Sequence, residues 1–164
     1  MARADKPAGA APSNVAAVDF GDLAAIAGFT IRLANLLLYR DYYDRFAGGP
    51  GALTLGAISV MAVIDANPGI RQGAAAEALL IKRSNMTKLV DRLERRGLVR
   101  RRASGRDRRA VGLHLTPVGR RRLGVLLPAI AAHDAEATAP LSPRDRRVLV
   151  GLLGKLVAAK RGGA

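Results

Sequence analysis

The sequence contains no cysteine and no tryptophan, and aromatic residues make up only 4% of it. A chain without thiols forms no disulfides, has no thiolate redox switch and offers no sulfur ligand to a metal. Only two histidines are present, and neither a glycine-rich phosphate loop nor a nucleophile beside a base can be found. We therefore expect no metal site, no cofactor and no enzymatic activity.

Long apolar runs and acidic residues are also scarce. No run approaches the ~18 apolar residues that a membrane span requires, and the N-terminus shows no apolar segment followed by a cleavage site. We therefore expect a cytoplasmic protein that does not enter a membrane. Lys and Arg number 27 against 13 acids, which gives a net charge of +14 and indicates a polyanionic partner.

The positive charge is concentrated in one quarter of the chain. Residues 82–122 hold fifteen Lys and Arg and three acids, so they carry +12 of the total charge of +14. A protein that is merely basic would spread this charge. The concentration is the footprint of a module that binds double-stranded DNA, and because the cluster is not one amphipathic helix, nucleic acid is favoured over a membrane surface.

This basic stretch begins with a predicted helix. Met86, Leu89, Val90 and Leu93 are spaced i, i+3, i+4 and i+7, which is one apolar stripe of a helix, and Gly97 predicts its end. The opposite side holds residues able to bind base edges or phosphates, and we predict DNA contacts at Arg83, Ser84, Asn85, Thr87, Lys88 and Arg92. The alternative is that these residues only cap or solvate the helix.

A predicted β-hairpin follows. Leu98–Arg102 and Ala110–Leu115 are β-prone, and the residues between them are typical of a turn. Arg100–Arg102 cannot all face DNA, because alternate residues of a strand point to opposite faces. We predict that the tip of the hairpin contacts DNA through Arg106, Asp107, Arg108 and Arg109, with Asp107 orienting Arg109 through a bidentate pair.

The rest of the chain predicts further helices. Cap residues, breakers and apolar stripes place them at Asp19–Phe46, at Thr54–Asn67, at Arg71–Leu80, from Pro117 towards Ala137, and from Pro143 to about Lys160. In Thr54–Asn67, the residues Ile58, Met61, Ala62 and Asp65 share the predicted inner face. Pro128 should kink or split the helix that contains it.

Together these elements describe a winged helix-turn-helix, and the motifs resemble one family in particular. Asp107-x-Arg109 followed by Leu113-x-Leu115-Thr116-x-x-Gly119 resembles the wing signature of the MarR family (multiple antibiotic resistance regulators). Leu89-Val90-Asp91-Arg92-Leu93-Glu94-x-x-Gly97-Leu98-Val99 is similar to the end of its recognition helix. The resemblance covers roughly Thr54 to Gly119. One departure is Ala75, near which the family usually has a bulky leucine.

The resemblance implies a mainly α fold with a small β-hairpin wing and a homodimer that binds a pseudo-palindromic operator. The implied organisation is a dimerisation helix at 19–50, a winged helix-turn-helix lobe at 54–119 and C-terminal dimerisation helices at 120–164. Residues 1–18, which are rich in Ala, Pro and Gly, predict a disordered or loosely ordered arm. The residues independently favour a dimer, because the first and last helices carry apolar faces that a monomer of this length would struggle to cover.

Members of the family commonly bind a small, often aromatic, anionic effector between the dimerisation helices and the DNA-binding lobe. From this resemblance we predict effector contacts at Arg32, Tyr39, Tyr42, Met61, Asp65 and His133. An arginine beside tyrosines suits an aromatic acid or its thioester. The alternatives are that Tyr39 and Met61 are plain core, that Arg32 pairs with an acid of the partner subunit, and that His133 is a histidine of the helix surface.

The predicted function is that of a repressor released from its operator by such an effector. A regulator that ignores ligands or activates transcription would have the same fold. The rival of another class is a basic protein that binds DNA or RNA with little sequence preference and serves an architectural role.

Overall fold

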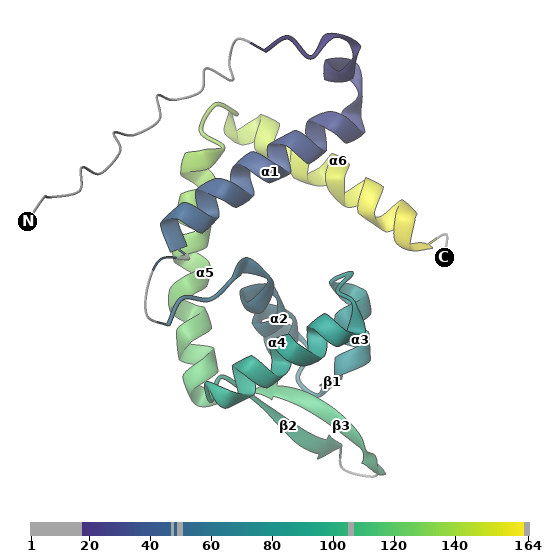
Figure 1. The fold of residues 1–164 in the computed structure, drawn as a ribbon, viewed down its shortest axis with the longest axis vertical. Helices are drawn as coiled ribbons and strands as arrows, with labels where there is room; N and C mark the ends of the chain where they lie inside the picture. Colours follow the sequence, from purple (N-terminus) through teal and green to yellow (C-terminus); the bar gives the residue numbers. More distant parts are fainter. Residues whose placement is uncertain (1–17, 47, 49–50, 105–106, 163–164) are drawn as a thin grey trace, which may run out of the picture. The chain divides into compact units, whose positions relative to one another are not determined.

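The computed structural model of the protein describes residues 18–46, 48, 51–104 and 107–162, in two compact units that divide between Leu38 and Tyr39. The elements, drawn in Figure 1, are a 3₁₀ helix (Gly21–Ala25), α1 (Ala27–Phe46), α2 (Leu55–Ala66), β1 (Ile70–Arg71), α3 (Gln72–Ala78), α4 (Arg83–Arg95), β2 (Val99–Ser104), β3 (Asp107–Leu115), α5 (Pro117–Ala137) and α6 (Pro143–Gly162). This mainly α chain with a small antiparallel sheet confirms the predicted fold class. Of the predicted N-terminal arm, residues 1–17 lie outside the described residues.

The first unit corrects the prediction of one helix over Asp19–Phe46. The chain instead forms the 3₁₀ helix, becomes extended at Ile26 (ψ 110°), and starts α1 at Ala27. The rings of Phe20 and Phe29 lie 5.4 Å apart. In a continuous helix nine residues would separate them by ~13 Å along the axis, so the break at Ile26 is what allows this contact.

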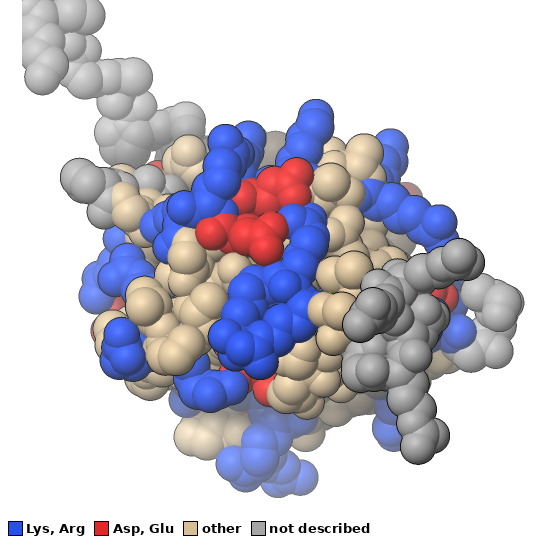
Figure 2. All heavy atoms as spheres, turned by 90° about the horizontal axis from the view of Figure 1, so that it is seen from below, with Lys and Arg blue, Asp and Glu red and all other residues tan. Residues whose placement is uncertain are grey.

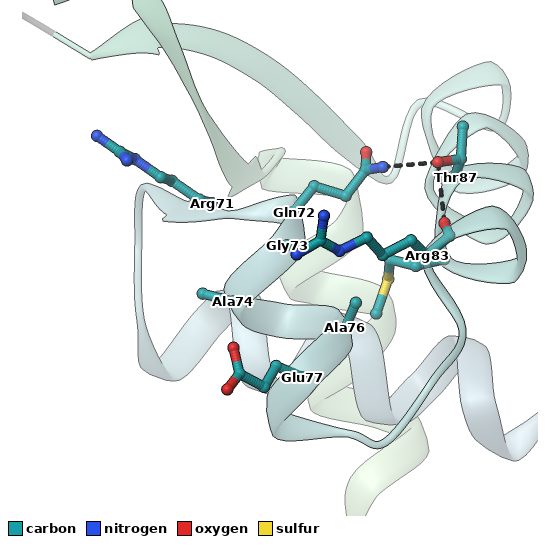
Figure 3. A pocket seen from close by; sticks show the side chains of 9 residues that line it. Arg71, Gln72, Gly73, Ala74, Ala76, Glu77, Arg83 and Thr87 are labelled. Carbon is teal, nitrogen blue, oxygen red and sulfur yellow. Dashed lines mark hydrogen bonds between the residues drawn. The ribbon is translucent and has the colours of Figure 1, made fainter.

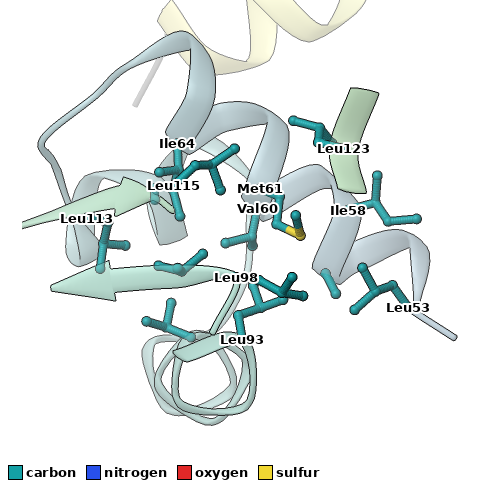
Figure 4. Close-up of a cluster of buried hydrophobic side chains, with 14 of the residues drawn as sticks. Leu53, Ile58, Val60, Met61, Ile64, Leu93, Leu98, Leu113, Leu115 and Leu123 are labelled. Atoms are coloured by element: carbon teal, nitrogen blue, oxygen red, sulfur yellow. The ribbon is translucent and has the colours of Figure 1, made fainter. Parts of the chain in front are cut away.

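In the second unit, α2 forms the centre of an aliphatic core (Figure 4). The helix starts as predicted, because the Thr54 hydroxyl accepts a hydrogen bond from the Ala57 amide at 3.2 Å. Val60, Met61 and Ile64 are 0% exposed. Contacts with α3, α4, α5 and β3 cover this helix on several sides.

The predicted inner face of α2 was therefore too narrow. Val60 and Ile64 are fully buried as well, whereas Asp65 is half-buried and forms an ion pair with Arg120. A helix that is covered on several sides is apolar nearly all round, so a single stripe does not describe it.

The sheet contains a strand that the sequence did not predict. Its order is β1-β3-β2, and β1 pairs antiparallel with β3 through Ile70–Leu113 and Arg71–Gly112. The predicted helix Arg71–Leu80 accordingly shortens to α3, and Arg71 belongs to a strand. Gly112 has a role here, because a Cβ at this position would lie 2.7 Å from the carbonyl oxygen of Gly69. Two residues are too few to show the alternation that marks a strand.

The last two helices begin with the predicted devices. The Thr116 hydroxyl accepts from the Gly119 amide at 2.9 Å, and the Ser142 hydroxyl accepts from the Asp145 amide at 3.2 Å. The alternative that Pro128 splits its helix was wrong, since α5 runs through it to Ala137. In the part of the chain that the structure describes, no helix has both the length and the apolar character needed to cross a membrane.

Candidate nucleic-acid interface

The apolar stripe of α4 fixes which side of this helix faces outward. Met86 and Val90 are 0% exposed and Leu93 is 1% exposed, and all three belong to the core. The opposite side is consequently exposed. All the predicted contact residues of this helix are exposed, namely Arg83, Ser84, Asn85, Thr87, Lys88 and Arg92. The structure therefore leaves each of them accessible to a partner, as DNA contacts would require.

The end of α4 is closed by a Schellman motif. Gly97 has φ 65°, the Leu98 amide donates to the Leu93 carbonyl at 2.9 Å, and the Gly97 amide donates to the Glu94 carbonyl at 2.8 Å. The neighbouring Arg96 donates to the carbonyl oxygens of Gly51 at 2.5 Å and Ala52 at 3.0 Å. Arg96 thus anchors the loop before α2 to the end of α4.

The surface that carries α4 and the sheet is strongly basic. Viewed from below, as in Figure 2, Lys and Arg side chains cover much of this surface and surround a small group of acids. Such a field attracts the phosphates of a nucleic acid and releases their counterions on binding.

Arg101 lies on β2, and its side chain reaches α4 and α3 rather than solvent. Its guanidinium binds Asp91 Oδ1 at 2.7 Å, the Glu94 carboxylate and Gln72 Oε1 at 2.9 Å. Partial burial would lower the pKa of Arg101, but the hydrogen bonds to Asp91 and Glu94 outweigh it and raise the pKa above its ordinary value. The guanidinium thus ties β2 to both α4 and α3.

Sequence reasoning missed this role of Arg101. The available signal was the pair of acids at Asp91 and Glu94, three residues apart in an otherwise basic stretch, where they could share one cation on a helix surface. The sequence alone did not show which of the three arginines Arg100–Arg102 has a side chain that faces α4.

A groove of 540 Å³ lies along α3 and the first turns of α4 (Figure 3), and Gln72, Arg83 and Thr87 are among the residues that line it. Gln72 reaches across from α3, and its Nε2 donates to Thr87 Oγ1 at 2.8 Å. Gln72 and Thr87 thus form a direct link between α3 and α4 at the edge of this groove.

The tip of the wing is described only in part. Asp107, Arg108 and Arg109 lie in β3, which pairs antiparallel with β2, and Ser104 faces Asp107 across an irregularity in the ladder. Arg106 lies outside the described residues, and so do the side chains of Asp107–Arg109. Their predicted DNA contacts and the predicted Asp107–Arg109 pair remain predictions.

Two of the predicted effector residues, Tyr42 and His133, meet through the ring of Phe46, which was not among the predicted contacts. Tyr42 stacks on Phe46 with ring centroids 5.0 Å apart, and Phe46 meets His133 edge-on at 5.4 Å. Tyr42 is buried and donates to the Leu53 carbonyl at 3.2 Å, and burial followed by the nearby Tyr39 raises its pKa. Within the described part of the chain, His133 Nε2 is buried without a hydrogen-bond partner.

The other predicted effector residues lie in different surroundings. Met61 is part of the fully buried core, and Asp65 accepts from Arg120 Nε at 3.1 Å. Tyr39 is 46% exposed in the second unit, and Arg32 is exposed in the first unit. The second unit thus brings Tyr42 and His133 together, whereas Met61 and Asp65 already have protein partners.

Known proteins resemble this chain over most of its length. The model of the MarR family matches residues 53–110. A protein of Thauera aromatica named for transcriptional regulation of the hcr operon is 35% identical over 146 residues, covering 89% of this chain and 87% of that protein. The transcriptional repressor CouR bound to a 23-mer DNA duplex superimposes with a TM-score of 0.78 at 33% identity, covering 85% of this chain and 98% of that one. CouR bound to p-coumaroyl-CoA gives a TM-score of 0.72 at 31% identity, covering 85% and 97%.

The helix-turn-helix of α3 and α4 and the sheet that follows it define a winged-helix protein. Taken with these relatives, the chain belongs to the MarR family of transcriptional regulators.

Proposed function

We propose that this protein is a repressor that binds a specific double-stranded DNA operator in the cytoplasm and acts by binding rather than by catalysis. The observation that carries the proposal is the exposed face of α4. Six polar or basic side chains of this helix are exposed, while Met86, Val90 and Leu93 hold its apolar side in the core. An α-helix so presented fits the major groove, where each base pair shows a distinct pattern of donors and acceptors. The DNA-bound CouR structure, at 33% identity, supports the same use of this fold.

The active form in this proposal is a homodimer. Helix α6 exposes Val148, Leu149, Leu152 and Leu156 by 52%, 42%, 57% and 48%, and these residues recur at helical spacing along one side. A continuous apolar stripe of this kind marks an interface rather than a solvated helix. A two-fold dimer then reads two half-sites ~34–36 Å apart, which makes the operator pseudo-palindromic.

We further propose that an anionic aromatic compound, free or as its thioester, releases the operator. Tyr42, Phe46 and His133 pack together in the second unit, and such a ligand would contact this group after displacing part of the packing. The CouR complex with p-coumaroyl-CoA supports this class of effector. Release follows if the effector binds better to a conformation whose recognition helices no longer match successive major grooves.

Two hydrogen bonds join the start of α5 to the end of the recognition helix. Thr116, at the start of α5, donates its hydroxyl to the Gly97 carbonyl at 2.6 Å and its amide to the Leu98 carbonyl at 3.0 Å. His133 lies near the other end of the same helix. A change in the direction of α5 would therefore carry the end of α4 with it.

The experiment that tests the proposal is selection of bound sequences from a random duplex library, followed by release with a panel of aromatic acids and their thioesters. A repressor should enrich a palindrome, bind it ~10³-fold or more tightly than random duplex, and lose it in the presence of one compound class. If no sequence is enriched, an architectural DNA- or RNA-binding protein replaces the repressor. A palindrome that no compound releases would indicate a regulator that ignores ligands.

A further inference from the structure

A chain of hydrogen bonds runs from the wing to the exposed face of the recognition helix. It starts at Arg101 on β2, passes through Gln72 at the start of α3, and ends at Thr87 on α4. The Arg101 side chain is 30% exposed and is held by Asp91 at 2.7 Å and by Glu94, so its position is fixed from two sides. The Arg101 amide also donates to Glu94 Oε1 at 3.1 Å.

The chemistry of the first link determines the second. A guanidinium carries only donors, so the atom of Gln72 that it binds at 2.9 Å must be the amide oxygen. The amide nitrogen then faces Thr87 and donates to its Oγ1 at 2.8 Å. A free glutamine could turn its amide over, but Arg101 forbids the reversed orientation because two donors would face each other.

Thr87 consequently has one hydrogen-bonding possibility left. Its hydroxyl has a single proton, which it donates to the Arg83 carbonyl at 3.0 Å, and one lone pair already accepts from Gln72. The remaining lone pair is the only polar group that this hydroxyl can offer to a ligand. Thr87 is exposed and lines the groove between α3 and α4 (Figure 3).

We propose that Arg101 and Gln72 are positioning residues that hold Thr87 as a hydrogen-bond acceptor, and that Thr87 recognises the exocyclic amino group of a cytosine or an adenine in the major groove. The inference rests on the proposed binding of a DNA operator and adds a base preference to it. In the major groove, cytosine N4 and adenine N6 are donors, whereas guanine O6 and N7 and thymine O4 are acceptors. Phosphate oxygens are acceptors too, so a Thr87 hydroxyl held in this state favours bases with an amino group over the backbone.

The first test compares the wild type with Thr87→Val, which keeps the shape of the side chain and loses the hydroxyl. Sequence selection with both proteins should identify one operator position at which the wild type enriches cytosine or adenine and the valine variant does not. A duplex with purine in place of that adenine, or 2-pyrimidinone in place of that cytosine, lacks only the amino group. We expect this deletion to weaken wild-type binding about three- to tenfold and to leave the affinity of Thr87→Val unchanged. Thr87→Ser, which retains the hydroxyl, should restore the sensitivity.

The second test addresses the positioning residues. Gln72→Leu removes the link to Thr87 and leaves the ion pairs of Arg101 with Asp91 and Glu94 in place. We expect it to reduce the effect of the amino deletion to less than twofold, while affinity for random duplex changes by less than twofold. The control is Arg102→Leu, which leaves the Arg101–Gln72–Thr87 hydrogen bonds in place because adjacent strand residues point to opposite faces, and which should keep the full effect of the amino deletion whatever it does to overall affinity. Circular dichroism checks that each variant is folded.

The outcomes separate the inference from the proposed function. If the wild type enriches no sequence, the proposed operator binding fails and the inference fails with it. If an operator is found but the amino deletion weakens wild type and Thr87→Val equally, the role of Thr87 is wrong and the proposed function stands. If Gln72→Leu keeps the full sensitivity to the amino group, Thr87 recognises the base without help from Arg101 and Gln72, and their positioning role is overturned.

Discussion

The hydroxyl of Thr116 donates to the carbonyl oxygen of Gly97 at 2.6 Å and thereby joins the first turn of α5 to the end of the recognition helix. The same hydroxyl accepts from the Gly119 amide at 2.9 Å, so one side chain both caps α5 and binds the turn that ends α4. Leu98, which follows Gly97 in the chain, is 5% exposed and belongs to the core. The start of α5 is therefore held directly against the end of α4.

This junction requires glycine at position 119. A Cβ there would lie 2.0 Å from the carbonyl oxygen of Leu98, which is backbone and cannot turn aside. We expect Gly119→Ala to lower the free energy of unfolding by about 2–4 kcal/mol, because α5 would have to move away from the end of α4. Denaturant titration followed by circular dichroism measures the change.

Gly124→Ala in the same helix is the matched control. No atom lies within 4 Å of a Cβ at that position, so alanine should be neutral or stabilise the protein by up to about 1 kcal/mol. Equal stability of the two variants would contradict the close approach of α5 to Leu98.

Tyr42 should make stability depend on alkaline pH. Burial, and after it Tyr39, raises the pKa of Tyr42 above its ordinary value of 10.0, so the folded state favours the neutral phenol. Its contribution is complete below the unfolded pKa and is lost as the pH rises through the higher folded pKa. At pH 8 we expect Tyr42→Phe to cost about 1 kcal/mol, from the lost hydrogen bond to the Leu53 carbonyl.

The measurement is denaturant unfolding of wild type and Tyr42→Phe between pH 8 and 11. The stability advantage of the wild type should shrink as the pH rises. The Tyr42 phenol ionises more easily in the unfolded state than in the folded state, and the phenylalanine variant has no phenol at this position. A difference that stays constant across the range would show that Tyr42 ionises equally easily in both states. Tyr43→Phe, at a side chain with 56% relative exposure, should leave stability at pH 8 unchanged.

Features that depend on neighbouring residues in the chain were predictable from the sequence. The caps at Thr54 and Thr116 and the end of α4 at Gly97 follow from local chemistry, and the structure has all three. The break at Ile26 and the strand β1 were not predictable from local patterns. The break accompanies the contact between the rings of Phe20 and Phe29, and β1 depends on its pairing with β3. Ile70 becomes a strand only because β3 lies beside it.

The candidate site shows the same division. Periodicity alone identified the outward face of α4, because an apolar stripe fixes its opposite side. The partners of Arg101 come from two other elements, Gln72 from α3 and the two acids from α4, so no local pattern predicted their meeting. Arginines that look alike in the sequence therefore have different roles, and Arg96 and Arg101 mainly hold other elements in place.

Asn85 should distinguish reading of bases from general attraction to DNA. It is exposed on the outward face of α4, and an asparagine can make a bidentate contact to an adenine in the major groove. We expect Asn85→Ala to weaken binding to the selected operator by about 1–3 kcal/mol and binding to random duplex by less than ~0.5 kcal/mol. Fluorescence anisotropy with both duplexes measures this. Asn67→Ala, whose side chain donates to the Val63 carbonyl at 3.0 Å, is the control and should weaken neither. An equal loss on both duplexes would make Asn85 a phosphate contact.

The apolar side of α6 should determine whether the protein dimerises. Leu152, 57% exposed, lies in the middle of the stripe formed with Val148, Leu149 and Leu156. Leu152→Glu places a charge in the proposed interface, and we expect at least a tenfold weaker dimer, since burying an unpaired carboxylate costs several kcal/mol. Ala158→Glu introduces the same charge on the other side of the helix and should leave the dimer intact. Sedimentation velocity over a concentration series measures the dissociation constants of the dimers. The monomeric variant should also bind a palindromic operator more weakly than the wild type, because its two DNA-binding lobes are no longer linked. A dimer unchanged by Leu152→Glu would exclude this side of α6 from the interface, and the search would move to the exposed apolar residues of α1.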